Sequence, residues 1–185
     1  MDRTEIVTIT NMCMVYEGNK VLVQEKIDDD YYGITFPGGH VEKVESFTDA
    51  VIREVFEETG LKIFSPRLCG IKDWSNDDGS RYMVLFYKTN HFEGTLSSSD
   101  EGEVRWIELE EMKKMNLADG MDKMLEVFLD EKINEYFFYK ANGEWKEELK
   151  YQSSQVIEWC HSHYVALHAH VAHSRYASSL KFSLR

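Results

Sequence analysis

The stretch that most constrains the fold of this chain is residues 38–61, which read GGHVEKVESFTDAVIREVFEETGL. Ser46 is a good helix N-cap, and Asp49, three residues later, completes a loose capping box. Gly60 supplies the left-handed residue that commonly ends a helix. The spacing therefore predicts a helix that begins near Phe47 and stops at Gly60, after about three and a half turns.

Three glutamates fall on one side of this predicted helix. Glu54, Glu57 and Glu58 are spaced i, i+3 and i+4, so their side chains are neighbours on the helix surface. The apolar side chains expected on the other side, against a core, are Ile52, Val55 and Phe56. Carboxylate oxygens suit the hard cations Mg²⁺ and Mn²⁺, which also bind phosphate, and such an ion would relieve the repulsion between the acids. The alternative is a solvated acidic face.

The residues around these glutamates follow a fixed spacing. The pattern GX5EX7REUXEEXGU, with U a bulky aliphatic residue, is met by Gly39, Glu45, Arg53, Glu54, Val55, Glu57, Glu58, Gly60 and Leu61. This stretch resembles the Nudix box, the signature of the Nudix hydrolases. Nine specified positions at fixed spacing make the signal specific. The resemblance implies an α/β Nudix fold, in which a mixed sheet lies between helices (α/β/α) and carries flanking β-hairpins.

The same resemblance implies roles for the residues of the helix. Glu54, Glu57 and Glu58 would hold divalent ions, which lower the pKa of a water molecule and neutralise phosphate charge. Arg53 is expected to orient a neighbouring glutamate, because it lies one helical turn from both Asp49 and Glu57.

Candidate site residues also lie outside the helix. Gly39 lets the backbone approach a ligand closely, so its carbonyl is a candidate metal ligand, with a plain tight turn as the alternative. Glu45 is expected to stand behind the metal ligands. Nudix enzymes often take a further acid from a distant loop, and the candidates here are Asp100, Glu101 and Glu103. We choose Glu101 as this residue, which would act as a metal ligand or general base, against the alternative of a polar loop.

Within the family, residues 5–130 are similar to MutT-type enzymes, which split a nucleoside triphosphate into monophosphate and pyrophosphate. That comparison places Lys26 at a phosphate, Phe36 beside the base and Asp119 at the base edge. MutT carries an arginine at the first position and an amide at the last, and a carboxylate only accepts hydrogen bonds unless it is protonated. An oxidised nucleotide such as 8-oxo-dGTP is therefore one candidate substrate among others. The ordinary alternatives are a charge at the end of a strand for Lys26, a core side chain for Phe36 and a helix cap for Asp119.

Composition limits the class of partner. The chain has 185 residues, 43% of them hydrophobic, which suits one globular domain. A net charge of −12 argues against a nucleic-acid groove or an anionic membrane surface. With no apolar run of about 18 residues, no apparent secretory signal and three scattered cysteines, a cytoplasmic protein is expected. The expected ligand is a small nucleotide, and pairing with a second copy is left open.

The remaining elements follow from periodicity and turn residues. Residues 5–23 predict a leading hairpin, residues 63–87 two strands around a turn at 76–79, and residues 97–108 an acidic loop that enters a strand. Further helices are predicted at 110–115 and 119–129, with a hairpin at 135–146. Strands between helices predict the α/β class.

The composition changes abruptly after residue 150. Residues 151–185 hold one of the 33 acidic residues but five of the seven histidines, His161, His163, His168, His170 and His173. A transition-metal site, a terminal helix and a segment foreign to the domain are all open readings. We therefore set the Nudix domain at residues 1–150 and place the tail outside the functional unit.

Two classes of function remain at this point. The first is a metal-dependent nucleoside triphosphate pyrophosphohydrolase, with a hydrolase of another nucleoside diphosphate derivative as a variant. The second is a module that senses a nucleotide without cleaving it. The intact acid set favours the enzyme, because a module that only binds has no need of three crowded carboxylates.

Overall fold

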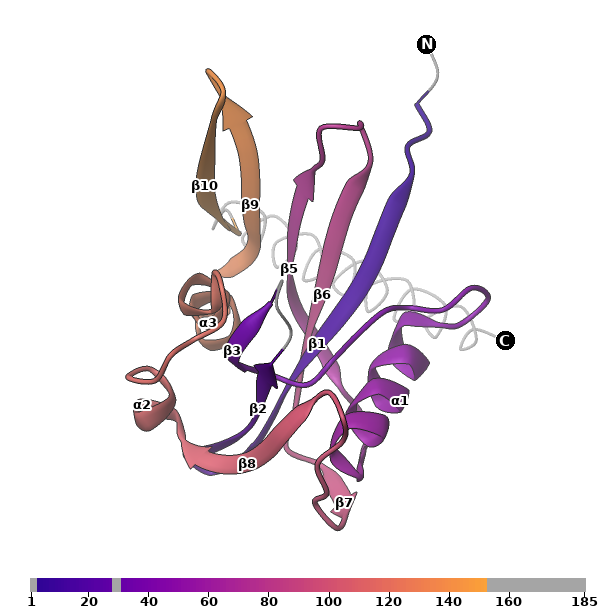
Figure 1. Ribbon diagram of the computed structural model, residues 1–185, viewed down its shortest axis with the longest axis vertical. Coiled ribbons are helices and arrows are strands. Elements are labelled where there is room, and N and C mark those ends of the chain that lie inside the picture. Colours follow the sequence, from indigo (N-terminus) through magenta and orange to yellow (C-terminus); the bar gives the residue numbers. More distant parts are fainter. Residues whose placement is uncertain (1–2, 28–30, 153–185) are drawn as a thin grey trace, which may run out of the picture. The chain divides into compact units, whose positions relative to one another are not determined.

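The computed structural model describes residues 3–27 and 31–152. The strands of the main sheet are β1 (Val7–Glu17), β2 (Lys20–Ile27), β3 (Tyr32–Thr35), β5 (Arg67–Ser75), β6 (Arg81–Thr89), β8 (Gly102–Glu108), β9 (Ile133–Ala141) and β10 (Glu144–Tyr151). A separate small sheet pairs β4 (Leu61–Ile63) with β7 (Phe92–Gly94). The helices are α1 (Phe47–Thr59), α2 (Leu109–Met112) and α3 (Met121–Leu129). In the main sheet the order is β10-β9-β5-β6-β1-β2-β3, with β8 also paired to β2 (Figure 1).

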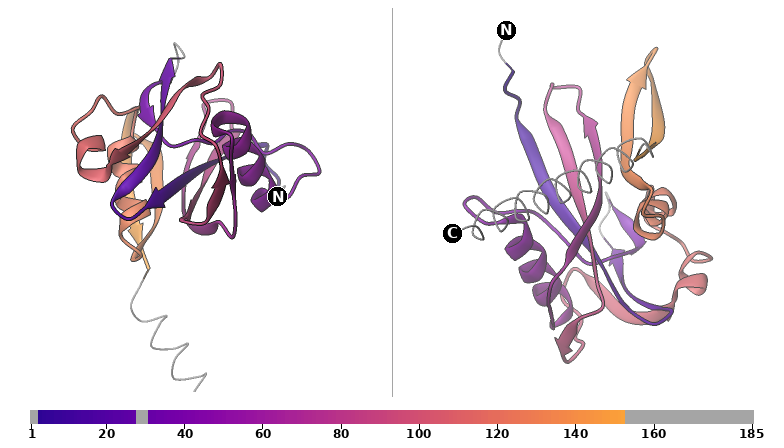
Figure 2. Two further views of the ribbon diagram at one scale, coloured as in Figure 1. Left: turned by 90° about the horizontal axis from the view of Figure 1, so that it is seen from below. Right: turned by 180° about the vertical axis from the view of Figure 1, so that it is seen from behind.

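The main sheet is mixed, and helices cover both of its faces. Strand β1 runs parallel to β6, and β5 runs parallel to β9, whereas the other pairs are antiparallel. Because successive side chains of a strand point to opposite faces, Met12 and Met14 of β1 enter the core beside α3, and Cys13 and Val15 enter the core beside α1. The two helices therefore lie on opposite sides of the sheet (Figure 2), which confirms the predicted α/β/α arrangement.

The helix α1 forms where the capping residues predict it. The Ser46 hydroxyl accepts the Asp49 N–H at 3.0 Å, and Gly60, at φ 72°, ends the helix by donating to the Phe56 carbonyl at 2.8 Å. The prediction that Phe56 packs inward was wrong, because its side chain is 56% exposed. Glu54 and Glu58 occupy the buried side of α1 instead, so this helix turns acids as well as apolar residues inward.

The glycine pair is fixed against β1 rather than left in a free loop. Strands β1 and β2 pair at only two residue pairs beside their turn, and the chain after β3 runs along β1 beyond them. There the Asn11 N–H donates to the Gly39 carbonyl at 2.8 Å, and the Cys13 N–H donates to the Pro37 carbonyl at 2.9 Å. Gly38 has φ 153° and lies so close to the Asn11 backbone that a Cβ would overlap it.

The helix predicted at 110–115 is shorter than expected. It ends at Met112, and the chain then becomes extended beside β3. The Ile34 N–H donates to the Asn116 carbonyl at 2.8 Å, and the Ala118 N–H donates to the Ile34 carbonyl at 3.0 Å. These bonds to a neighbouring strand compete with a further helical turn.

The predicted hairpins around residues 18–19, 76–79 and 142–143 are all present. The predicted domain of residues 1–150 reaches almost to the end of β10 at Tyr151, and the assignment of the tail stays a prediction, because the histidines named above lie outside the described residues. No helix within residues 3–27 and 31–152 is long and apolar enough to cross a membrane.

Candidate functional site

The guanidinium of Arg53 organises one half of the acidic face. Its Nε and Nη2 donate to the two carboxylate oxygens of Glu45, each at 2.9 Å. Its Nη1 donates to Glu54 at 2.8 Å and to Glu57 at 3.0 Å, and its Nη2 also reaches the His40 carbonyl at 3.0 Å. The hydrogen bonds from Arg53 hold the pKa of Glu45 below its usual value. The predicted contact between Arg53 and neighbouring glutamates is therefore present.

The ammonium of Lys26 organises the other half. It donates to Glu58 at 2.7 Å and to Glu101 at 2.5 Å, and the Gly38 N–H donates to the other oxygen of Glu58 at 2.7 Å. Burial raises the pKa of Glu58 to about 7 even though Lys26 acts in the opposite direction. The hydrogen bond from Lys26 lowers the pKa of Glu101. The loop acid chosen from the sequence is thus joined to α1 by a shared cation.

Gly39 and Glu54 are in close contact. A Cβ at Gly39 would overlap the Glu54 carboxylate, so this position accepts only glycine without a rearrangement. Glu54 is 9% exposed, and burial raises the pKa of its carboxyl group. The Gly39 carbonyl proposed as a metal ligand already accepts the Asn11 N–H, which leaves one of its two lone pairs.

The acidic side chains of α1 are the candidate ligands for a divalent cation. Within residues 3–27 and 31–152, no three acidic, histidine or cysteine side chains converge on one point. Glu54 and Glu57 are turned to Arg53, and Glu58 is turned to Lys26, so cations of the protein satisfy these acids. The donors are nevertheless all carboxylates on one side of one helix, and two of them are buried with raised pKa values. They fit Mg²⁺ or Mn²⁺ chemically, once the side chains turn from their present partners.

Two predicted substrate contacts lie apart from this cluster. Phe36 is 1% exposed, and its ring meets the edge of Phe128 with centroids 5.1 Å apart, so its position supports the alternative role in the core. Asp119 is exposed and does not cap α3, because Gly120 is the N-cap and no side chain bonds there. The cap alternative for Asp119 was therefore wrong.

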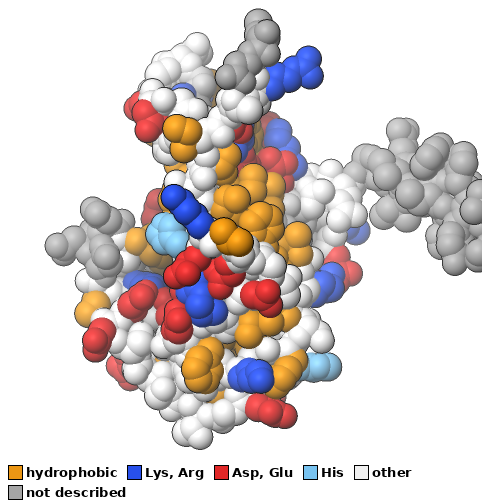
Figure 3. Space-filling model, turned by 90° about the vertical axis from the view of Figure 1, so that its right-hand side faces the viewer, with side chains coloured by type: hydrophobic (Ala, Val, Ile, Leu, Met, Phe, Trp, Pro, Cys, Tyr) orange, Lys and Arg blue, Asp and Glu red, His pale blue; other side chains and the backbone are white. Residues whose placement is uncertain are grey.

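A row of aromatic side chains beside the acids was not predicted from the sequence. The ring of His40 lies 6.5 Å from that of Tyr82, and Tyr82 stacks on Trp74 at 4.6 Å with an interplanar angle of 11°. The signal available was the alternation of Lys72 and Trp74 on one strand opposite Tyr82 on the next. Figure 3 shows acidic and basic side chains gathered on the side where α1 lies, with hydrophobic side chains next to them.

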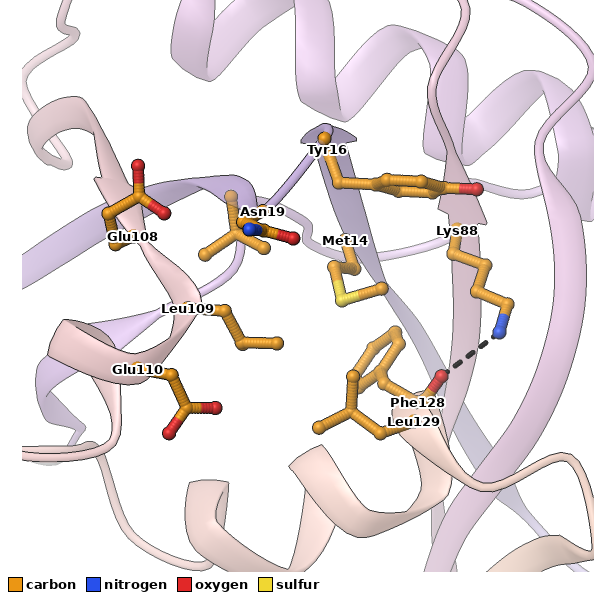
Figure 4. Close-up of a pocket in the computed structure, with 11 residues that line it drawn as sticks. Met14, Tyr16, Asn19, Lys88, Glu108, Leu109, Glu110, Phe128 and Leu129 are labelled. Atoms are coloured by element: carbon orange, nitrogen blue, oxygen red, sulfur yellow. Dashed lines mark hydrogen bonds between the residues drawn. The ribbon is translucent and has the colours of Figure 1, made fainter.

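A separate cavity of about 450 Å³ contains none of the predicted site residues (Figure 4). Its apolar lining includes Met14, Leu109 and Leu129, and Lys88 at its edge donates to the Phe128 carbonyl at 3.0 Å. The predicted catalytic, substrate-binding and metal-binding residues therefore lie outside this cavity.

Comparison with known proteins identifies the class that this fold and site define. Residues 8–128 match the NUDIX domain model, and the chain belongs to the Nudix family of hydrolases. Over 131 residues it is 30% identical to the uncharacterized Nudix hydrolase YvcI of Bacillus subtilis, covering 68% of this chain and 81% of the relative. It is 27% identical over 119 residues to an ADP-ribose pyrophosphatase of Methanocaldococcus jannaschii, covering 63% and 69%. The MutT protein of Bacillus halodurans superposes with a TM-score of 0.65 at 27% identity, covering 77% of this chain and 97% of that protein.

Proposed function

We propose that this Nudix hydrolase cleaves a nucleoside triphosphate between the α and β phosphates, with Mg²⁺ or Mn²⁺, to release a nucleoside monophosphate and pyrophosphate. The observation that carries the proposal is the position of Lys26, which links Glu58 of α1 to Glu101 of a distant loop. A chain with net charge −12 needs local cations to receive a triphosphate, and Lys26 and Arg53 stand beside the acids.

The residues of the cluster divide the work of hydrolysis. Glu54, Glu57 and Glu58 would hold the divalent ion, which supplies positive charge beside the phosphates and acidifies water. Arg53 keeps the glutamates in place through its bonds to Glu54 and Glu57. Glu101, whose pKa is lowered, is charged at neutral pH and accepts the proton of the attacking water.

Lys26 would be the cation that receives a phosphate of the substrate in this reaction. If Glu58 held a divalent ion, Lys26 would lose one of its two carboxylate partners and could donate to a phosphate oxygen while it keeps its contact with Glu101. Water then forms a bond to phosphorus as the anhydride P–O bond breaks, and the pyrophosphate leaving group carries away the electron pair. Charge stabilisation and positioning supply most of the rate enhancement in this type of reaction.

The likeness to a MutT structure at 27% identity supports the triphosphate, and an oxidised precursor such as 8-oxo-dGTP belongs among the candidates. A nucleoside diphosphate derivative is the second candidate, supported by the likeness to the ADP-ribose pyrophosphatase. Both substrates present a pyrophosphate linkage to the same acids.

A substrate panel tests the proposal directly. The full chain is incubated with Mg²⁺ and normal and oxidised nucleoside triphosphates, ADP-ribose and other nucleoside diphosphate derivatives, and the products are separated by ion-exchange chromatography. We expect monophosphate and pyrophosphate in equal amounts from a triphosphate. Higher catalytic efficiency on ADP-ribose would favour the second candidate. Tight binding of a nucleotide without any turnover would replace the enzyme by a sensing module.

A further inference from the structure

Lys72 is a buried lysine whose ammonium lies among three aromatic rings, with the charges of Asp119, Glu147 and Asp122 acting on it from further away. It is 9% exposed, and its Nζ makes no hydrogen bond or ion pair with the residues that the structure describes. The ammonium lies 5.4 Å from the ring centroids of Trp74 and Tyr136 and 5.0 Å from that of Phe138. Cation–π contacts return part of the cost of desolvation, but the three N–H donors remain unused. These unused N–H donors can bond to an acceptor on a ligand.

Lys72 stands at the end of the aromatic row that begins at the acidic face. The His40 carbonyl accepts a hydrogen bond from Arg53 at 3.0 Å, which attaches the row to the acids. From the His40 ring the row continues through Tyr82 and Trp74, with neighbouring rings 4.6–6.5 Å apart, and Trp74 borders Lys72. His40 is exposed and Tyr82 and Trp74 are half-buried, so a nucleotide with its phosphates at the acids can place its base beside this row.

Lys72 also lies against Gly120, the residue that follows Asp119. A Cβ added to Gly120 would lie 3.1 Å from the Lys72 Nζ, so the ammonium rests against the residue that follows Asp119. The charge of Asp119 acts on both Lys72 and Tyr31, and Lys26 acts on Tyr31 as well. Tyr31 therefore lies within electrostatic range of both Lys26 and Asp119. Asp119 itself is exposed and can turn to water, whereas the buried Lys72 cannot.

We propose that Lys72 is a specificity-determining residue that donates a hydrogen bond to a carbonyl oxygen of the substrate's base, so that the enzyme prefers keto purines to adenine. This inference rests on the proposed function and adds the class of base. An ammonium has donors and no acceptor, so it pairs with the 6-keto oxygen of a guanine-type base. The 6-amino group of adenine is itself a donor, so it would leave the Lys72 ammonium unpaired inside the protein. A binding site with a buried donor discriminates strongly against a ligand that leaves this donor unpaired.

The test compares catalytic efficiencies for dGTP and dATP with Mg²⁺ in the wild-type chain, in Lys72→Met and in Lys140→Met. Lys140 is the matched control, because its ammonium lies 4.8 Å from the Trp145 ring and is also bonded to Asp77. We expect the wild-type chain to prefer dGTP. In Lys72→Met the ratio of catalytic efficiencies for dGTP and dATP should fall at least about 10-fold, because one hydrogen bond to a charged group is lost. Lys140→Met should keep the wild-type ratio, because a structural lysine changes rates for both nucleotides together.

Three outcomes separate this inference from the proposed function. A wild-type chain that hydrolyses dATP as well as dGTP overturns the role of Lys72, whatever the variants do. An unchanged ratio in Lys72→Met, or in Lys72→Gln if the methionine variant does not fold, overturns it as well. If no nucleotide is hydrolysed, the proposed function fails, and calorimetric titration with dGMP and dAMP still decides whether Lys72 selects the keto base.

Discussion

Arg53 and Glu45 are joined by two hydrogen bonds, from Nε to Oε1 and from Nη2 to Oε2, each 2.9 Å long. Glu45 precedes α1 and Arg53 lies in its second turn, so the pair ties the loop to the helix. The same guanidinium holds Glu54 and Glu57 through its remaining nitrogen. A planar fork with several donors can do this, whereas a single ammonium group cannot.

Arg53→Lys should lower kcat about 10- to 100-fold while KM changes little, because misplaced metal ligands affect the reacting geometry more than phosphate binding. Steady-state kinetics with Mg²⁺ measure both constants on the triphosphate that the chain hydrolyses best. Arg67→Lys is the matched control, since Arg67 pairs at 2.7 Å with the exposed Glu131. A wild-type kcat in Arg53→Lys would show that the fork does not position the glutamates.

Glu57→Gln should reduce turnover at least about 100-fold and leave the fold intact. Its side chain is 56% exposed, so the lost ion pair with Arg53 changes the free energy of unfolding by no more than about 1 kcal/mol. Calorimetric titration with Mn²⁺ should show weaker binding, because one carboxylate ligand is gone. Glu110→Gln, which breaks the exposed pair with Lys113, should keep both activity and Mn²⁺ affinity. A large loss of thermal stability in metal-free Glu57→Gln would make Glu57 a structural residue instead.

The capping residues predicted the two ends of α1 correctly, whereas the prediction of which of its side chains are buried was partly wrong. Ser46 and Gly60 fix the ends of the helix through contacts within a few residues, and such contacts are visible in a sequence. The orientation of Phe56 depends on which side of α1 meets the sheet. Glu54 and Glu58 lie on that side because Arg53 and Lys26 offset their burial. The spacing of apolar residues along the sequence does not predict that these ion pairs offset the burial of two acids.

The long-range part of the site was predicted only where a family pattern supplied it. The box placed the acids of α1, and the comparison with MutT-type enzymes placed Lys26, which the structure joins to Glu58. Lys72 and the stacked pair of Trp74 and Tyr82 belong to a cross-strand arrangement, and its register is decided by the whole sheet. A sequence shows the alternation but not which strands become neighbours.

Lys26→Met should cost about 3 kcal/mol of the free energy of unfolding without metal, because it leaves the buried Glu58 carboxylate without its cation. The double variant Lys26→Met/Glu58→Gln should recover at least about half of that loss, since the uncompensated charge is then gone. Urea denaturation with a chelator measures all three chains, and added Mg²⁺ should stabilise Lys26→Met more than the wild-type chain. Equal losses in the single and double variants would show that packing of the lysine stem, rather than charge, is what the substitution removes.

The burial of Lys72 makes stability depend on pH. Burial lowers the pKa of Lys72, against the opposing charges of Asp119, Glu147 and Asp122. The folded chain then binds fewer protons than the unfolded chain between the folded pKa and the unfolded value of about 10.4, so this group's contribution to stability rises with pH across that window. Lys72→Met has no ammonium group to bury. It should therefore be about 1 kcal/mol more stable than the wild-type chain at pH 7, and this difference should become smaller towards pH 10. Urea denaturation at several pH values gives the difference, with Lys140→Met as the exposed control. A difference that stays constant from pH 7 to 10 would mean that Lys72 keeps an ordinary pKa in the folded protein.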